Sequence, residues 1–178
     1  DLSGVRVSKG EYVEAALEEL MGDAKLVGDV VQTWLDKAGD RPTLAFGVNR
    51  AHAARLQRQF EAHGISTEYV DGFTDRVERE WIGDRFRSGE VRVICSVRTM
   101  TTGVDLPVSC IVDAAPTRSE MLHVQKIGRG LRVNDGTEDC LILDHAGNSH
   151  RLGLVTDIRY DSLDTTPPGE RRETSSER

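Results

Sequence analysis

The sequence QKIGRGLR, residues 125–132, contains two arginines whose spacing suits the binding of an anion. Arg129 and Arg132 lie three residues apart, so on a helical turn they share one face. The glycines around them, Gly128 and Gly130, lower the steric barrier to a ligand. A pair of guanidinium groups can stabilise a phosphoryl group during its transfer. A solvated basic turn is the alternative interpretation, and the pair alone does not decide between the two.

A second candidate segment, SVRTMTTGVDLP, spans residues 96–107 and is rich in hydroxyl groups. Hydroxyl and backbone N–H groups at the end of a strand suit contacts with a phosphate backbone. The carboxylate of Asp105 can accept hydrogen bonds from ribose hydroxyls. The alternative is a polar turn without a ligand.

Several other reactive side chains have structural interpretations. The spacing of Asp144, His145 and His150 is not that of a metal site, and we expect none. His52 and His63 flank an amphipathic helix and are expected at the surface. The three cysteines fall in apolar runs and are expected to be small core residues: Cys95, Cys110 and Cys140.

The pattern of apolar residues predicts an α/β fold that would position these segments. Apolar runs predict buried strands at residues 43–48, 66–70, 91–95, 110–114 and 139–143. Helices are predicted between them, over residues 50–62, 75–87 and 119–127. Such alternation indicates a parallel sheet that helices cover on both faces, with its functional residues at the carboxyl ends of the strands.

The ends of the chain differ from this middle part. Ser8 and Glu11 have the spacing of a capping box, which predicts a helix over residues 9–21, and a second helix is expected over residues 25–38. The proline-containing, charged C-terminal end is expected to be disordered over residues 157–178.

Charge and composition exclude several classes of protein. The net charge is −7, but residues 41–156 contain equal numbers of acidic and basic side chains. This balance argues against a generally basic nucleic-acid-binding surface, but it does not exclude a local arginine-lined groove. No run of apolar residues is long enough to span a membrane. The sequence also lacks a G-x-x-x-x-G-K-[ST] phosphate loop, G-x-S-x-G, H-E-x-x-H and C-x-x-C.

Taken in order, the segments resemble the second RecA-like domain of superfamily 2 helicases, of the DEAD/DEAH type found in phages and bacteria. TLAFGVNRAHA resembles motif IV, VICSVRTMTTGVDLP resembles motif V, and QKIGRGLR is similar to motif VI. The resemblance extends from Thr43 to about His150. Val97 stands where many members have Asp, and Lys126 stands where Arg is common.

The resemblance implies a role for each matching residue. Arg129 and Arg132 would act as catalytic residues at the γ-phosphate of ATP, with Gln125 at the same cleft. Gly103, Asp105 and Gly128 would contribute to ATP binding. Mg²⁺ would be held mainly by the first RecA-like domain. The single-strand path would be lined by Gly47, Asn49, Arg50, Ser96, Arg98, Thr99, Thr101 and Thr102.

The start at Asp1 and the missing phosphate loop lead us to expect the C-terminal half of a longer protein. Residues 1–40 would be a helical connection from the first RecA-like domain, and residues 41–156 the helicase C-terminal RecA-like domain. Residues 157–178 would be the tail. The expected partners are that first domain and a nucleic acid, which the resemblance to phage members implies is DNA, and no membrane.

The expected function is that of the C-terminal motor domain of an ATP-dependent helicase or translocase, inactive as an ATPase without the first domain. The expected location is the cytoplasm, of the bacterial host if the protein is phage-encoded. One alternative is a stand-alone nucleic-acid-binding or regulatory module with a RecA-like fold. Another is a structural α/β domain in a restriction or repair complex.

Overall fold

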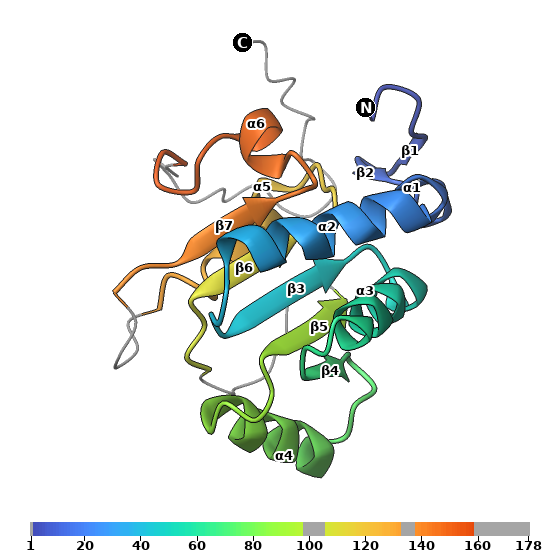
Figure 1. Ribbon diagram of the computed structural model, residues 1–178. Helices are drawn as coiled ribbons and strands as arrows, with labels where there is room; N and C mark the ends of the chain where they lie inside the picture. Colours follow the sequence, from blue (N-terminus) through green and yellow to red (C-terminus); the bar gives the residue numbers. More distant parts are fainter. Residues whose placement is uncertain (1, 98–105, 133–137, 159–178) are drawn as a thin grey trace.

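The computed structural model describes residues 2–97, 106–132 and 138–158, and its centre is a five-stranded sheet in the order β4-β5-β3-β6-β7 (Figure 1). All neighbouring strands in it are parallel, and the register places Ala45 between Cys95 and Val112. The predicted parallel sheet is confirmed, with small shifts at the strand ends. The strands are β3 (Thr43–Gly47), β4 (Thr67–Val70), β5 (Val93–Val97), β6 (Cys110–Asp113) and β7 (Leu141–Asp144).

Helices cover both faces of the sheet, as predicted. In Figure 1, α2 crosses in front of the sheet and α5 lies behind it. Four helices carry an apolar face at helical spacing, and a side chain caps the first turn of each. On one face are α2 (Ala24–Lys37) and α3 (Arg50–Ala62), and on the other are α4 (Arg76–Arg87) and α5 (Glu120–Ile127).

Helix α2 is anchored in the core by Trp34. The indole Nε1 donates a hydrogen bond to Thr43 Oγ1 at 2.8 Å, and the ring packs edge-to-face on Phe60 with 5.4 Å between centroids. Because Trp34 is only 1% exposed, its packing holds α2 against the sheet. The helix is therefore a component of this core although its residues precede residue 41, and the predicted domain boundary there stays a prediction.

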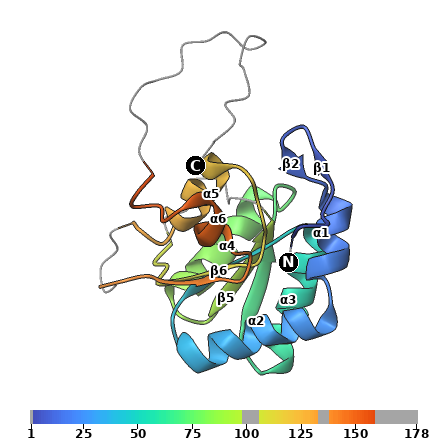
Figure 2. The same cartoon turned by 90° about the horizontal axis from the view of Figure 1, so that it is seen from above.

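The predicted helix over residues 9–21 is wrong in its first third. Residues 7–12 form a small antiparallel pair, β1 (Val7–Ser8) and β2 (Glu11–Tyr12), which stands beside α1 in Figure 2. The turn between them has positive φ at Lys9 (50°) and Gly10 (79°), as in the tight turn that favours a hairpin. Helix α1 begins only at Glu14 and ends at Met21, and no side chain caps it.

A short helix, α6 (Asn148–Leu152), follows β7 and was not predicted from the sequence. It begins after Gly147, whose φ of 64° is accessible mainly to glycine. Most of the predicted disordered tail, residues 159–178, lies outside the described residues.

Candidate functional site

The two spaced arginines lie at the end of α5 and in the turn that follows it. The N–H groups of Arg129 and Gly130 donate to the carbonyls of Lys126 (3.2 Å) and Ile127 (2.9 Å), so a helical turn continues beyond the helix. A Cβ atom at Gly130 would overlap the sulfur of Cys140. Glycine therefore allows this turn to pack closely against the sheet, which fixes the backbone next to the arginines.

The guanidinium of Arg129 is a partly buried positive charge. Within the described ranges, its side chain has no hydrogen-bond or ion-pair partner. Burial lowers the pKa of Arg129, and the positive charge of Arg132 lowers it further. Arg132 and Gln125 are exposed. The predicted catalytic residues therefore lie on one short segment, whose positive charge an anion would stabilise.

A buried polar network holds α5 at the end of β6. Lys126 Nζ donates to Asp113 Oδ1 at 2.5 Å and to the carbonyl of Ala115 at 2.8 Å. Asn148 Nδ2 donates to the other carboxylate oxygen of Asp113 at 2.8 Å. The side-chain oxygen of Asn148 accepts from the Thr117 N–H at 3.0 Å. These residues connect β6, α5 and α6, and they position the helix that carries the arginines.

Asp113 and Asn148 were not predicted from the sequence to have a role. A signal was present for Asp113, because an acidic residue closes the otherwise apolar run CIVD. Lys126, the one lysine among the basic residues of 41–156, offered a partner for it. Asn148 had no signal, since the helix it begins was itself not predicted.

Glu11 connects the N-terminal hairpin to the loop that starts α5. Its two carboxylate oxygens accept hydrogen bonds from Thr117 Oγ1 (2.5 Å) and from the Arg118 N–H (2.9 Å). Thr117 Oγ1 in turn accepts from the Ser119 N–H at 3.0 Å. Glu11, which was predicted to form a capping box with Ser8, thus stabilises the distant loop at Thr117 and Arg118 instead.

Two of the residues predicted to line the single-strand path, Gly47 and Asn49, are buried and make structural contacts within the domain. Asn49 Oδ1 accepts from the His52 N–H at 2.9 Å, which caps α3, and its Nδ2 donates to Glu18 Oε2 at 2.6 Å. A Cβ atom at Gly47 would lie 2.8 Å from the backbone nitrogen of Ala53. These residues set the close approach of β3 to α3.

Arg50, in contrast, is exposed at the carboxyl edge of the sheet. Its Nε lies 2.8 Å from Oδ2 of Asp71, which follows β4, and Tyr69 donates its hydroxyl to the same oxygen at 2.8 Å. Burial opposes ionisation of Asp71, but the hydrogen bonds from Tyr69 and the Phe73 N–H, with the charge of Arg50, keep its pKa below the usual value. The pKa of Arg50 is raised by Tyr69 and Asp71.

Of the remaining predicted residues, Gly128 ends α5, Ser96 lies within β5, and the others come after that strand in the sequence. Ser96 is 1% exposed, and its Oγ has no hydrogen-bond partner in the described part of the chain. Its hydroxyl therefore lies beneath the surface at the end of β5. The other predicted residues of this segment lie outside the described residues: Arg98, Thr99, Thr101, Thr102, Gly103 and Asp105.

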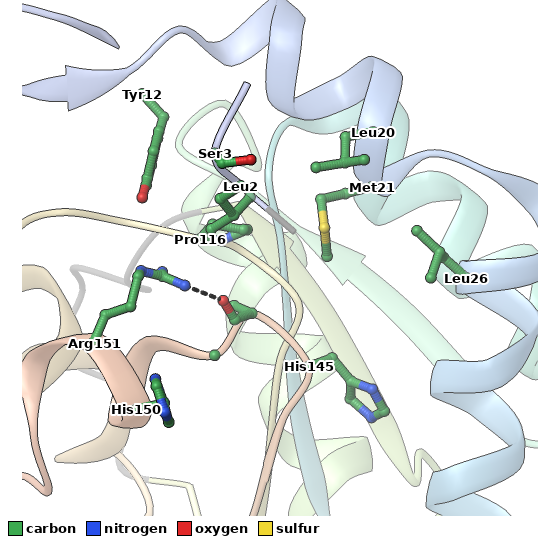
Figure 3. A pocket seen from close by; sticks show the side chains of 12 residues that line it. Leu2, Ser3, Tyr12, Leu20, Met21, Leu26, Pro116, His145, His150 and Arg151 are labelled. Atoms are coloured by element: carbon green, nitrogen blue, oxygen red, sulfur yellow. Dashed lines mark hydrogen bonds between the residues drawn. The ribbon is translucent and has the colours of Figure 1, made fainter. Parts of the chain in front are cut away.

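A pocket of about 610 Å³ lies between the N-terminal segment and the β7–α6 connection (Figure 3). Leu2, Met21 and Pro116 supply apolar walls. Arg151 reaches its rim, but one guanidinium nitrogen donates to the Ala146 carbonyl at 2.7 Å and another to Asn148 Oδ1 at 2.6 Å. The arginine thus serves the loop rather than a ligand, and the pocket contains none of the predicted site residues.

The prediction that His52 is a surface residue is wrong, whereas His63 is exposed as predicted. His52 is 1% exposed, and its Nδ1 accepts a hydrogen bond from the Val48 N–H at 3.1 Å. Burial, with a smaller contribution from Arg55, lowers the pKa of His52 to about 4.

The cysteines behave as core residues where they lie in strands. Cys95 and Cys110 are buried and Cys140 is partly buried, and burial raises the pKa of Cys110 to about 12 and of Cys140 to about 11. In the described ranges, no three His, Cys, Asp or Glu side chains are grouped to hold a metal ion. The helices described there include none long and apolar enough to cross a membrane.

Comparisons with known proteins agree with this architecture. A structure of the C-terminal domain of the DEAD-box protein Dbp5 matches with a TM-score of 0.57 and 22% identity, over 71% of this chain and 73% of that one. The yeast DEAD-box splicing factor Prp28 matches with a TM-score of 0.55 and 21% identity, over 66% of this chain and 27% of that one. At this identity the likeness concerns the fold.

Sequence relatives give a more specific result. The putative ATP-dependent helicase IRC3 of Saccharomyces cerevisiae is 36% identical over 173 residues, which cover 92% of this chain and 25% of the relative. A 51.5 kDa protein of a Lactococcus phage is 28% identical, over 92% of this chain and 36% of its own length. This chain therefore spans about a quarter of the yeast protein and about a third of the phage protein.

Residues 25–134 match the family described as the helicase conserved C-terminal domain. The matched region contains β3 to β6 and helices α3 to α5, and it includes the paired arginines. It also begins within α2, the helix that Trp34 anchors to the sheet. The chain belongs to the helicase C-terminal domain family, in the RecA-like form found in ATP-dependent helicases.

Proposed function

We propose that this chain is the C-terminal motor domain of an ATP-dependent helicase or translocase and supplies its arginine fingers. The observation that carries the proposal is the partly buried guanidinium of Arg129, which has no ion-pair partner among the residues that the structure describes, with the exposed Arg132 near enough to lower its pKa. An ATP γ-phosphate would neutralise both charges, and their stabilisation of the transition state would accelerate hydrolysis. Gln125 would contact the same cleft.

In this proposal, the first RecA-like domain holds most of the nucleotide and the Mg²⁺ ion. Closure of the two domains would bring Arg129 to the γ-phosphate, and hydrolysis would reopen the cleft. Gly103, Asp105 and Gly128 would complete the nucleotide site. The absence of a phosphate loop from the sequence supports the proposal that the chain alone does not hydrolyse ATP.

The proposed second ligand is a single strand, DNA by the resemblance to phage and bacterial helicases. Arg50 would contact its phosphates at the carboxyl edge of the sheet. Gly47 and Asn49 would act by shaping the β3–α3 turn that presents Arg50, since both are buried or internally bonded. Ser96, which is buried in β5, would act on the strand indirectly.

The test is nucleotide hydrolysis by a polypeptide that joins this chain to a first RecA-like domain. Hydrolysis is measured with and without single-stranded DNA or RNA, for wild type, Arg129→Ala, Arg129→Lys and the control Arg58→Ala. Arg58 is exposed on α3 and has no assigned role. We expect Arg129→Ala to lower the stimulated rate by ~10³-fold or more, because the transition state loses its counter-charge.

Arg129→Lys should remain impaired, because an ammonium cannot reproduce the planar, bidentate contact of a guanidinium. Nucleotide affinity should change little, since the first domain holds most of the nucleotide. A hydrolysis rate that is the same in Arg129→Ala and wild type would contradict the motor proposal. It would favour the alternative, a stand-alone nucleic-acid-binding or regulatory module. Stronger stimulation by RNA than by DNA would contradict only the proposal that the strand is DNA.

A further inference from the structure

We propose that Phe73 is a stacking platform for a base of the single strand, with Arg50 binding the adjacent phosphate. Phe73 lies in the turn between β4 and α4 and is 83% exposed, which is unusual for a large apolar side chain. The inference rests on the proposed function, because it assumes that a single strand crosses this edge. It adds a base-binding residue that the family resemblance does not supply.

The turn that carries Phe73 is held by its own hydrogen bonds. Asp71 Oδ1 accepts from the N–H groups of Phe73 (2.8 Å) and Thr74 (3.2 Å), and the Asp71 N–H donates to Thr74 Oγ1 at 3.0 Å. Arg79 donates to the carbonyls of Asp71 (2.8 Å) and Thr74 (2.9 Å). These hydrogen bonds fix the backbone that carries the exposed ring, so a ligand need not order this turn on binding.

Arg50, the first residue of α3, places its guanidinium against the Phe73 ring. Its guanidinium carbon lies 5.0 Å from the centroid of the Phe73 ring, and its Nε is paired with Asp71. The Arg50 side chain is 66% exposed, so its other N–H groups remain accessible to a phosphate oxygen. One site thus combines an accessible aromatic ring with a positive charge, the combination that sequence-independent single-strand binding uses.

The position of the pair agrees with the proposed strand path. Arg50 follows β3, Phe73 follows β4, and the strand between them in the sheet is β5. In Figure 1 these three parallel strands end on the same side of the sheet. A strand bound along this edge would therefore pass from the end of β5 to the Phe73 ring.

A protein partner is the competing occupant of this surface. Phe73 is followed at helical spacing by Val77 (76% exposed) and Trp81 (55% exposed) on α4. A protein docking on α4 would contact all three side chains. The guanidinium of Arg50 lies beside the Phe73 ring, and this positive charge favours an anionic ligand instead. Arg85, which lies 4.3 Å from the Trp81 ring, is already paired with Glu68 and Glu90.

The experiment measures binding of fluorescent oligodeoxythymidine, by anisotropy, to the polypeptide that joins this chain to a first RecA-like domain. Variants are Phe73→Ala, Phe73→Leu and Phe73→Trp, with Trp81→Ala as the matched control for an exposed aromatic. We expect Phe73→Ala and Phe73→Leu to weaken binding by about fivefold to a hundredfold, the range of base–aromatic stacking. Phe73→Trp and Trp81→Ala should bind like wild type.

An oligonucleotide with abasic sites separates stacking from charge. Wild type should bind it more weakly than oligodeoxythymidine, and Phe73→Ala should cause no further loss. Unchanged oligonucleotide affinity in Phe73→Ala, with a thermal midpoint like that of wild type, would overturn the proposal. It would also be overturned if Phe73→Ala, Val77→Ala and Trp81→Ala all weakened the packing of this domain on the first domain in the joined polypeptide while oligonucleotide binding stayed intact, since that result identifies a protein-docking face.

The two proposals fail in different ways. If Arg129→Ala leaves hydrolysis unchanged while Phe73→Ala weakens oligonucleotide binding, the motor function is contradicted and the platform is supported. If Arg129→Ala abolishes hydrolysis while Phe73→Ala binds like wild type, only the platform is contradicted.

Discussion

Lys126 Nζ lies 2.5 Å from Asp113 Oδ1, and the two side chains are 1% and 0% exposed. The pair joins the last turn of α5 to the end of β6, three residues before Arg129. Two charges removed from water in this way are stable only when each finds its partner. The contact therefore couples the fold of the domain to the position of the arginine segment.

We predict that Lys126→Met lowers the free energy of unfolding by ~3–5 kcal/mol, because it leaves the Asp113 carboxylate buried without a counter-charge. Denaturant titration of the variant measures the change. The control is Lys126→Arg, which keeps the charge and has N–H groups for both Asp113 and the Ala115 carbonyl. Equal stability of Lys126→Met and wild type would show that the pair does not hold α5.

The free energy of unfolding should depend on pH because His52 is buried. Its pKa is about 4 in the fold and about 6.5 when unfolded. Between these values the unfolded chain binds the additional proton, so the stabilisation is complete above about pH 6.5 and is lost as the pH falls toward about 4. From about pH 7 to about pH 5, the loss should be about 2 kcal/mol.

Urea titrations at the two pH values test this prediction against His52→Gln and His63→Gln. The first variant should have a weaker pH dependence, whereas the second should behave like wild type because His63 is exposed. Burial also lowers the pKa of His145, so some dependence of the same sign should remain in His52→Gln. An unchanged slope in that variant would exclude His52 as a source.

The sheet was predictable because its signal is local. Each strand is an apolar run such as TLAFG, and alternation with amphipathic helices fixes the parallel arrangement. The hairpin was not predicted because the spacing of Ser8 and Glu11 fits a capping box as well as it fits a turn. The positive φ angles of Lys9 and Gly10 decide between them, and the tertiary contacts of Glu11 favour the hairpin.

The site was predictable only in part, for a related reason. The resemblance to motif VI suggested Arg129 and Arg132 from one short segment of sequence, and their role stays a prediction. The network of Asp113, Lys126 and Asn148 joins residues from three elements, which sequence spacing does not bring together. The turn containing Phe73 reads as an ordinary polar loop, DGFTD, until its exposure and its contact with Arg50 are seen.

Gly47→Ala should destabilise the domain, because the new Cβ would lie 2.8 Å from the Ala53 nitrogen and 2.9 Å from its Cα. Both are backbone atoms of α3, so relief requires β3 and α3 to separate. We expect a loss of ~1–3 kcal/mol in the free energy of unfolding. Gly28→Ala is the matched control, because Gly28 lies within α2 with open space around it.

The control should be stabilised by about 0.5–1 kcal/mol, since alanine reduces the conformational freedom of the unfolded chain at a helical position. Thermal unfolding of both variants measures the difference. If Gly47→Ala were as stable as wild type yet lost oligonucleotide affinity, Gly47 would contact the strand directly rather than shape the turn.

Glu11→Ala should loosen the connection between the hairpin and the start of α5. Removal of the carboxylate takes away the acceptors of Thr117 Oγ1 and the Arg118 N–H, so we expect faster amide hydrogen exchange at Arg118 and through residues 7–12. Glu19→Ala is the control, because Glu19 is exposed on α1 and makes no assigned contact. Exchange at Arg118 that matches the control would contradict the role of Glu11. Since the loop begins the helix that leads to Arg129, faster exchange extending to residues 120–127 would mean that the N-terminal hairpin helps to position the arginines.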